Sequence, residues 1–195
     1  MRLVFAGTQS VGKTTLVHDL AAAWPHARVE EEPIRAVARL TGESPPAVPT
    51  RAAERRLIDY GLGRLRAAAE RPNPGEVVLF DRSPLDAYAH AILSMETGGE
   101  VDPAFLAEVR PQVAEALSFA HLVVLVPMEP DVGNEADGFR YLDESNRRRV
   151  DAILHDLLRP ASGLCPRPVI VVRGDRRGRV GHIERFVAAL REHGE

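Results

Sequence analysis

Eight consecutive residues near the start of the chain have the types and spacing of a phosphate-binding loop. Residues 7–14 (GTQSVGKT) match the pattern G-x-x-x-x-G-K-S/T at every fixed position, after an apolar segment and before a helical one. The glycines let the backbone wrap around a phosphate, so that successive N–H groups bind its oxygens. We expect Lys13 to reach the β- and γ-phosphates of a nucleoside triphosphate, and the Thr14 hydroxyl to bind Mg²⁺. The predicted nucleotide-binding residues here are Gly7, Thr8, Gln9, Ser10, Val11, Gly12, Lys13, Thr14 and Thr15.

A second candidate group is an acidic residue at the end of an apolar segment. Residues 77–80 read VVLF, and Asp81 follows directly. This pattern is typical of a strand whose terminal carboxylate orients Mg²⁺, which makes Asp81 the second predicted metal ligand. The alternative is that Asp81 only caps the next helix, although Ser83 could cap it equally well. Arg82 would lie at the carboxyl end of a parallel strand, where a guanidinium could bind a phosphate or a pair of hydroxyls.

Three adjacent glutamates, residues 30–32, precede Pro33 at the end of another expected strand. Because neighbouring carboxylates repel one another and Pro33 fixes the turn, one of them could point into the cleft. A carboxylate near the γ-phosphate can accept the proton of an attacking hydroxyl. Arg35 would lie on the same side of the following helix and is a candidate substrate ligand. The alternative is a solvated acidic corner that pairs with Arg28 or Arg39.

A polar segment around residues 127–147 is expected to form a lid over the phosphates. Arg140 lies in it beside a glycine, and a mobile arginine that closes over the transferring phosphoryl group would stabilise its charge. For the arginines at 147–149, the alternative is a surface helix in which Glu144 and Asp151 pair with them. Tyr88 could stack on a substrate ring, with packing in the core as its alternative.

Apolar segments alternate with helical patterns along the chain, which predicts a parallel sheet with helices on both faces. Uniformly apolar strands would be buried on both sides. We expect one domain over residues 1–195, a normal size for a single core. The expected strands span residues 2–6, 28–31, 76–80, 121–126 and 168–172, and the expected helices 14–23, 33–40, 50–71, 85–95, 103–120, 143–158 and 180–193.

The composition narrows the choice of partners. The net charge of −3 gives no indication of a nucleic-acid binder or a polybasic membrane anchor. No apolar stretch approaches the ~20 residues that span a bilayer, and Cys165 is the only cysteine, so we expect a cytoplasmic protein without disulfides. Of the 25 Lys and Arg residues, Lys13 is the one lysine, so a compact ammonium is kept only where it would fit among phosphate oxygens.

Four segments together resemble a known family. GTQSVGKTTL, EPIR, FDRSPLDAYAHA and DGFRYLDESNRRRVDAIL are similar to the small P-loop family that includes the nicotinamide riboside kinase domain of bacterial NAD-metabolism proteins. They are also similar to deoxynucleoside and thymidylate kinases. The resemblance covers nearly the whole chain. It implies a P-loop NTPase three-layer α/β sandwich with a five-stranded parallel sheet in the order 2-3-1-4-5 and a lid after strand four.

The resemblance also implies roles for particular residues. Glu32, immediately before proline, matches the glutamate that acts as base in the deoxynucleoside kinases. The run 81–83 (DRS) resembles their Glu-Arg-Ser motif. The loop after the fifth strand contacts adenine in such kinases, which indicates Arg173, Gly174 and Asp175. The resulting candidates are Lys13, Glu32, Asp81, Arg82 and Arg140 for catalysis, Glu32, Arg35, Arg82 and Tyr88 for the acceptor, and Arg140 and Arg147 for the lid.

The predicted activity is Mg-ATP-dependent phosphorylation of a small molecule: a nucleoside, a nucleotide or a related riboside. Only the resemblance favours ATP over GTP. The alternative is a P-loop NTPase that hydrolyses ATP or GTP without a small-molecule acceptor. A GTP-specific switch would need a motif such as N-K-x-D, which cannot occur where Lys13 is the only lysine. The expected partner is the phosphate acceptor, without nucleic acid or membrane, and a homodimer is left open.

Overall fold

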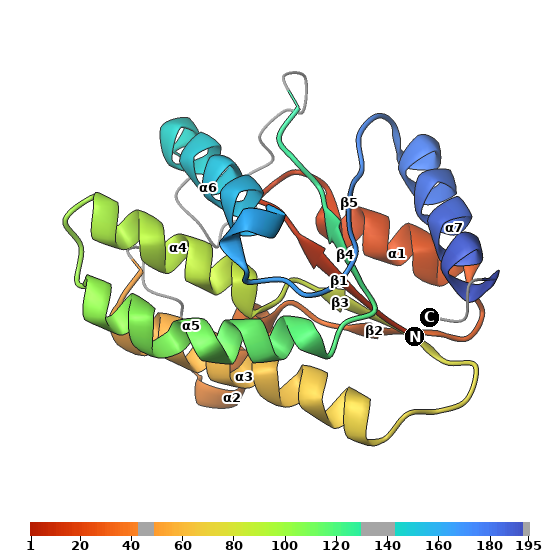
Figure 1. Ribbon diagram of the computed structural model, residues 1–195, viewed down its shortest axis with the longest axis horizontal. Helices are drawn as coiled ribbons and strands as arrows, with labels where there is room; N and C mark the ends of the chain where they lie inside the picture. The colour runs from red at the N-terminus through yellow and green to blue at the C-terminus, as the bar shows by residue number, and fades with distance from the viewer. Residues whose placement is uncertain (43–48, 130–142, 193–195) are drawn as a thin grey trace.

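The sheet has five parallel strands in the order β2-β3-β1-β4-β5 (Figure 1). The structure is a computed structural model, and it describes residues 1–42, 49–129 and 143–192. The predicted order 2-3-1-4-5 is therefore confirmed. The strands are β1 (Arg2–Ala6), β2 (Ala27–Glu30), β3 (Val77–Asp81), β4 (Leu122–Leu125) and β5 (Val169–Val171).

Helices cover both faces of the sheet, as the alternating pattern predicts (Figure 1). They are α1 (Lys13–Ala23), α2 (Pro33–Thr41), α3 (Arg51–Glu70), α4 (Pro84–Glu96), α5 (Pro103–Ser118), α6 (Glu144–Leu157) and α7 (Arg176–Glu192), with a short 3₁₀ turn η1 (Pro160–Ser162). Side chains alternate along β1: Val4 and Ala6 pack with α3 to α6, whereas Leu3 and Phe5 pack with α1 and α7. Thr50 caps α3 by accepting a hydrogen bond from Ala53 N–H.

Two expectations from the sequence are wrong in detail. The last helix begins at Arg176 and not at residue 180, because Asp175 accepts a hydrogen bond from Gly178 N–H in its first turn. Glycines in that turn hide the helical pattern in the sequence. The two edge strands are not uniformly buried: only Glu30 is buried in β2, and only Ile170 is buried in β5.

The strand register brings the predicted chemistry to one edge of the sheet. Phe5 aligns with Asp81, and Phe80 aligns with Glu30, so the carboxyl ends of β1, β3 and β2 lie side by side. Ligands of open parallel sheets bind at this edge. The P-loop follows β1, Arg82 follows β3, and the remaining glutamates follow β2.

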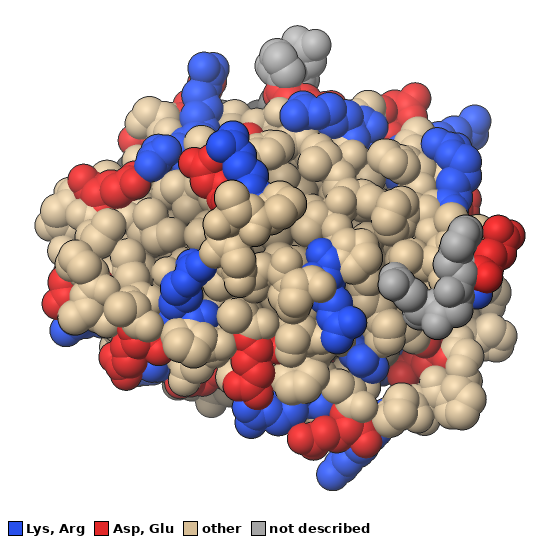
Figure 2. All heavy atoms as spheres, in the orientation of Figure 1, with Lys and Arg blue, Asp and Glu red and all other residues tan. Residues whose placement is uncertain are grey.

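The surface carries charges of both signs. Basic and acidic side chains are interspersed over the face shown in Figure 2, and exposed ion pairs such as Arg66–Glu115 (2.6 Å) join neighbouring helices. Within the described residues, no helix combines the length and the apolar character needed to cross a membrane.

Candidate functional site

The P-loop turns tightly between β1 and α1. A Cβ atom at Gly7 would lie 2.3 Å from the Val126 carbonyl oxygen, so no side chain fits there without movement of the backbone. Ser10 (φ 59°) and Gly12 (φ 85°) are in the left-handed region. Helix α1 begins at Lys13 without a side-chain cap on Gly12, so its first turn directs backbone N–H groups toward the loop. This arrangement suits an anion at the helix N-terminus.

Lys13 is buried in the centre of the site, with 4% of its surface exposed. Its Nζ donates a hydrogen bond to the carbonyl of Thr8, at 2.5 Å. Burial and, to a lesser extent, the nearby charge of Arg82 lower the pKa of Lys13 to about 7. The carboxylates of Asp86, Asp81 and Glu32 act in the opposite direction. The one lysine of the chain is therefore poised between its charged and neutral forms.

Thr14 and Asp81 form the predicted metal pair. The Thr14 hydroxyl donates to Asp81 Oδ2 at 2.7 Å, and Asp81 is buried at the end of β3. Its other oxygen, Oδ1, is buried and accepts no hydrogen bond from the described part of the chain. Because a buried carboxylate oxygen without a donor is costly, a cation at this position would remove the penalty. A hydroxyl beside a carboxylate is also the donor set that Mg²⁺ takes from a P-loop protein, with phosphate and water oxygens completing the shell. The residues present therefore fit Mg²⁺.

The capping role that could have explained Asp81 belongs to Ser83. The Ser83 hydroxyl accepts from Leu85 N–H at 3.1 Å at the start of α4. Asp86 completes the capping box by accepting from Ser83 N–H at 3.1 Å. Asp81 is left to face Thr14.

The first two glutamates of the acidic corner pair with arginines away from the P-loop. Glu31 pairs with Arg39 at the surface, as the solvated alternative predicts. Glu30, at the end of β2, pairs with Arg28 and with Arg64 of α3.

Glu32, in contrast, faces the site. It is 6% exposed, and its Oε1 lies 2.6 Å from Arg82 Nε, while Oε2 lies 3.3 Å from Arg35 Nε. The structure therefore brings Glu32, Arg82 and Arg35 together. Whether they act on an acceptor stays a prediction.

Arg82 has an unusual backbone conformation. Its φ of 82° lies in the left-handed region, which is unfavourable for a long side chain. The buried guanidinium lies between Glu32 and Asp86, with Nη1 3.5 Å from Asp86 Oδ1. Burial opposes its charge, but the carboxylates of Glu32, Asp86 and Asp81 raise its pKa. These ion pairs hold the strained turn after β3 in place.

Asp86 is a residue of this site that the sequence analysis missed. It is 3% exposed, and its Oδ1 accepts from Gly7 N–H of the P-loop at 3.2 Å. Burial raises the pKa of Asp86, while Arg82, Lys13 and the two backbone hydrogen bonds oppose the rise. The S-x-x-D spacing of residues 83–86 could have predicted the cap but not the contact with the P-loop.

The predicted lid residues have different outcomes. Arg140 lies outside the described residues, as do the other residues of 130–142. Arg147 is 4% exposed, and its Nε donates to the Gln9 carbonyl at 3.2 Å, so α6 contacts the outer side of the P-loop. The next two arginines lie in surface ion pairs, as the alternative of a surface helix predicts: Arg148 pairs with Glu144, and Arg149 pairs with Glu96.

The loop after β5 also reaches the P-loop, through a residue that the sequence analysis missed. Arg179 Nε donates to the Gly174 carbonyl, and its Nη1 donates to the Val11 carbonyl, both at 2.8 Å. Asp175 caps α7, and Arg173 is exposed. Tyr88 is 5% exposed and packs within the core between the sheet and α3 to α6, as its alternative predicts.

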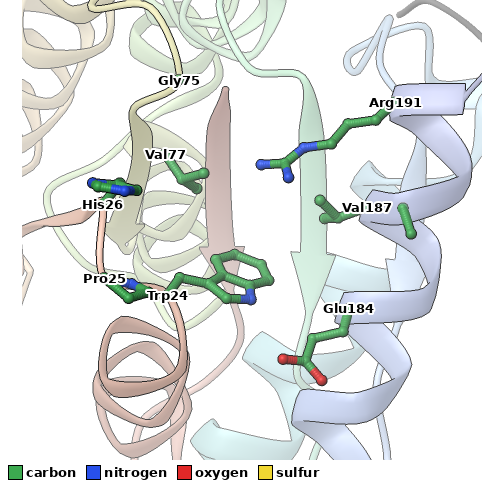
Figure 3. A pocket seen from close by; sticks show the side chains of 9 residues that line it. Trp24, Pro25, His26, Gly75, Val77, Glu184, Val187 and Arg191 are labelled. Carbon is green, nitrogen blue, oxygen red and sulfur yellow. The ribbon is translucent and has the colours of Figure 1, made fainter.

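A hollow of about 340 Å³ lies at the opposite end of the sheet (Figure 3). It is formed by the end of α1, the amino ends of β2 and β3 and the last turns of α7, with Trp24 and Arg191 directed into it (Figure 3). None of the predicted site residues lines it. The complete lining is Trp24, Pro25, His26, Gly75, Val77, Glu184, Val187, Ala188 and Arg191.

The sheet order, the P-loop and the position of Asp81 define the class of the protein as a P-loop nucleotide-binding protein. The chain belongs to a family described as an AAA domain, which matches residues 2–179. No curated protein sequence matches the chain.

Solved structures of the same fold include those of two kinases and of the protein NadR. The protein is similar to NadR in complex with NAD and AMP-PNP (TM-score 0.71, 16% identity), covering 96% of this chain and 49% of that one. It is similar to deoxyadenosine kinase from M. mycoides with dCMP and dCDP bound (TM-score 0.69, 11% identity, 97% and 100% covered). It is also similar to thymidylate kinase from Candida albicans (TM-score 0.71, 12% identity, 98% and 92% covered). The chain thus spans about half of the NadR structure, and at these identities the likeness establishes the fold.

Proposed function

We propose that this protein is a Mg-ATP-dependent phosphotransferase that phosphorylates a hydroxyl group of a small nucleoside or riboside. The observation that carries the proposal is the buried Glu32, which is ion-paired with Arg82 next to the P-loop lysine. A carboxylate in this place can accept the proton of an attacking hydroxyl. Two proteins of the same fold are named for small-molecule acceptors, deoxyadenosine kinase and thymidylate kinase, which agrees with the proposal.

The nucleotide would bind through the backbone of the P-loop and through Lys13. Thr14 and Asp81 would hold Mg²⁺, which neutralises charge on the phosphates when it is bound. Arg147 already contacts the outer side of the loop, and Arg140 is proposed to close over the transferring phosphoryl group. ATP is preferred to GTP on family resemblance.

The charges beside the P-loop support a hydroxyl acceptor over a phosphate acceptor. Three buried carboxylates, those of Glu32, Asp81 and Asp86, lie near Lys13, beside the position proposed for the acceptor. Arg82 is engaged with two of them. A phosphate monoester would bring two negative charges to this group, whereas a neutral hydroxyl needs the base that Glu32 provides. We therefore place nucleosides and neutral or cationic ribosides ahead of nucleoside monophosphates.

The experiment is a panel of nucleosides, nucleoside monophosphates and pyridine ribosides with γ-labelled ATP, run on the wild type and two variants. Glu32→Gln keeps the size of the side chain and removes the base. We expect transfer to fall by roughly 10²–10⁴ while ATP binding is retained. Glu31→Gln is the matched control, because Glu31 is the neighbouring carboxylate and pairs with Arg39 at the surface. It should transfer phosphate at the wild-type rate.

Two results would reject the kinase proposal. The first is that no panel member accepts phosphate, and the second is that Glu32→Gln hydrolyses ATP as fast as the wild type. Together they would favour the alternative, a P-loop NTPase without a small-molecule acceptor. A thermal melt of each variant without ligand shows whether a lost rate reflects lost folding, since Glu32 also balances the buried charge of Arg82.

A further inference from the structure

Arg179 lies in the first turns of α7, yet its guanidinium group is buried between two loops. Its side chain is 8% exposed. Nη1 donates to the Val11 carbonyl of the P-loop and Nε donates to the Gly174 carbonyl of the β5–α7 loop, each at 2.8 Å. The third nitrogen, Nη2, lies 3.3 Å from Oε2 of Glu129, a residue that follows β4. One side chain therefore joins the P-loop to two other loops at the same edge of the sheet.

Glu129 completes the connection from the other side. Its Oε1 accepts from Gly174 N–H at 2.8 Å, so the N–H of Gly174 is held by Glu129 and its carbonyl by Arg179. Gly174 has a φ of 92°, which places it in a left-handed turn. We call Arg179 and Glu129 the Gly174 clamp.

The P-loop itself explains why a buried arginine is needed at this place. A loop that turns its N–H groups toward a phosphate turns its carbonyl groups outward. The outward carbonyl of Val11 belongs to a residue that is almost fully buried, and a buried carbonyl without a donor is costly. A guanidinium has five N–H groups in one plane and can serve three acceptors together, which a lysine ammonium cannot do at these separations.

We propose that the Gly174 clamp positions residues 173–175 against the P-loop and thereby sets the affinity for the nucleoside part of the bound triphosphate. The inference rests on the proposed function in one respect, namely that the P-loop binds a nucleoside triphosphate, and on the expectation, implied by the resemblance to P-loop kinases, that residues 173–175 lie against its base. Arg179 and Glu129 are positioning residues. They act on the base through the backbone of Gly174, while the phosphates are bound by the P-loop.

The test compares two ligands, Mg-ATP and inorganic Mg-tripolyphosphate, which lacks the base and the ribose. Arg179→Lys keeps the charge but cannot reach all three acceptors, and Glu129→Gln keeps an acceptor for Gly174 N–H but removes the ion pair. We expect each variant to bind Mg-ATP about 10- to 100-fold more weakly, as for the loss of hydrogen bonds to a charged group. Glu129→Gln should bind Mg-tripolyphosphate within about twofold of the wild type. Arg179→Lys also loses the donor to the Val11 carbonyl, so it should weaken the binding of both ligands, but that of Mg-ATP more.

Arg176→Gln is the matched control, because Arg176 lies on the same helix, is exposed and pairs with Asp19 at the surface. It should leave both affinities unchanged. Amide hydrogen exchange at Gly174 gives a second measurement, and it should accelerate in the two clamp variants and not in the control.

An equal loss of affinity for both ligands would overturn the inference, since the clamp would then only support the P-loop. Unchanged binding of Mg-ATP in the variants would overturn it as well, as would weaker ATP binding with unaltered exchange at Gly174. All of these measurements are made without an acceptor. A protein that binds Mg-ATP but transfers no phosphate would thus refute the proposed function alone, whereas a wild type that does not bind Mg-ATP would refute both.

Discussion

Binding of Mg-ATP should take up a proton above neutral pH, because Lys13 releases its proton readily in the free protein. Burial brings the pKa of Lys13 down from 10.5 to about 7. The oxygens of a triphosphate favour the charged ammonium and should raise the pKa of Lys13 back toward its ordinary value of 10.5. A lysine that is mostly neutral before binding must therefore gain a proton when the nucleotide arrives.

The size of the effect follows from this pKa. At pH 8 about one tenth of Lys13 would be charged in the free protein, so binding should take up about 0.9 proton per site. At pH 6 Lys13 is already charged, and the uptake should fall to about 0.1 proton. The affinity for Mg-ATP should accordingly be constant below pH 7 and fall above it, approaching tenfold per pH unit.

Isothermal titration in buffers of different ionisation enthalpy measures the uptake directly. Lys13→Arg is the control, since arginine stays charged across this range and any binding that it retains should occur without proton uptake. An uptake near zero at pH 8 in the wild type, or an affinity that does not change between pH 7 and 9, would refute the reasoning. The lysine would then be charged in the free protein in spite of its burial.

Two further substitutions test the framework around the site, each by urea unfolding. Gly7→Ala should destabilise the protein by about 1–3 kcal/mol, because its Cβ would meet the Val126 carbonyl at 2.3 Å. Gly63→Ala, in open space on α3, should instead stabilise the protein by about 0.5–1 kcal/mol. If the two substitutions changed the free energy of unfolding equally, the close approach of Gly7 to Val126 would not be the cause. Asp86→Asn should cost about 1–3 kcal/mol, because a carboxamide has one acceptor oxygen for the two N–H groups of Gly7 and Ser83. Unchanged stability would show that these hydrogen bonds are dispensable.

Features that depend on neighbouring residues could be predicted from the sequence. The P-loop is contiguous, and the strand that ends at Asp81 is recognised from five residues. The strand order could not be predicted from neighbouring residues, because periodicity identifies strands without showing which of them pair. That order came from the resemblance to P-loop kinases, and the structure confirms it.

The missed residues are those whose partners lie far away in the sequence. Asp86 bonds to Gly7 across 79 positions, and Arg179 bonds to Val11 across 168. In the sequence Asp86 looks like an ordinary member of the first turn of a helix, and Arg179 directly precedes the helix expected over residues 180–193. Their roles arise only when the sheet brings α4 and α7 to the P-loop, so spacing along the chain could not reveal them.

The P-loop needs cations on its outer side as well as in its phosphate site. Three buried side chains donate to three of its outward carbonyls: Lys13 to Thr8, Arg147 to Gln9 and Arg179 to Val11. The two arginines are permanently charged and hold their carbonyls whether or not a nucleotide is present. Lys13 has a different task in the proposed function, because the cation that contacts Thr8 in the free protein would turn to the phosphates when they bind. A small ammonium with a pKa of about 7 can leave a carbonyl at little electrostatic cost, which a planar guanidinium bound to several acceptors cannot do. This difference explains why the only lysine in a chain so rich in arginine is found at position 13.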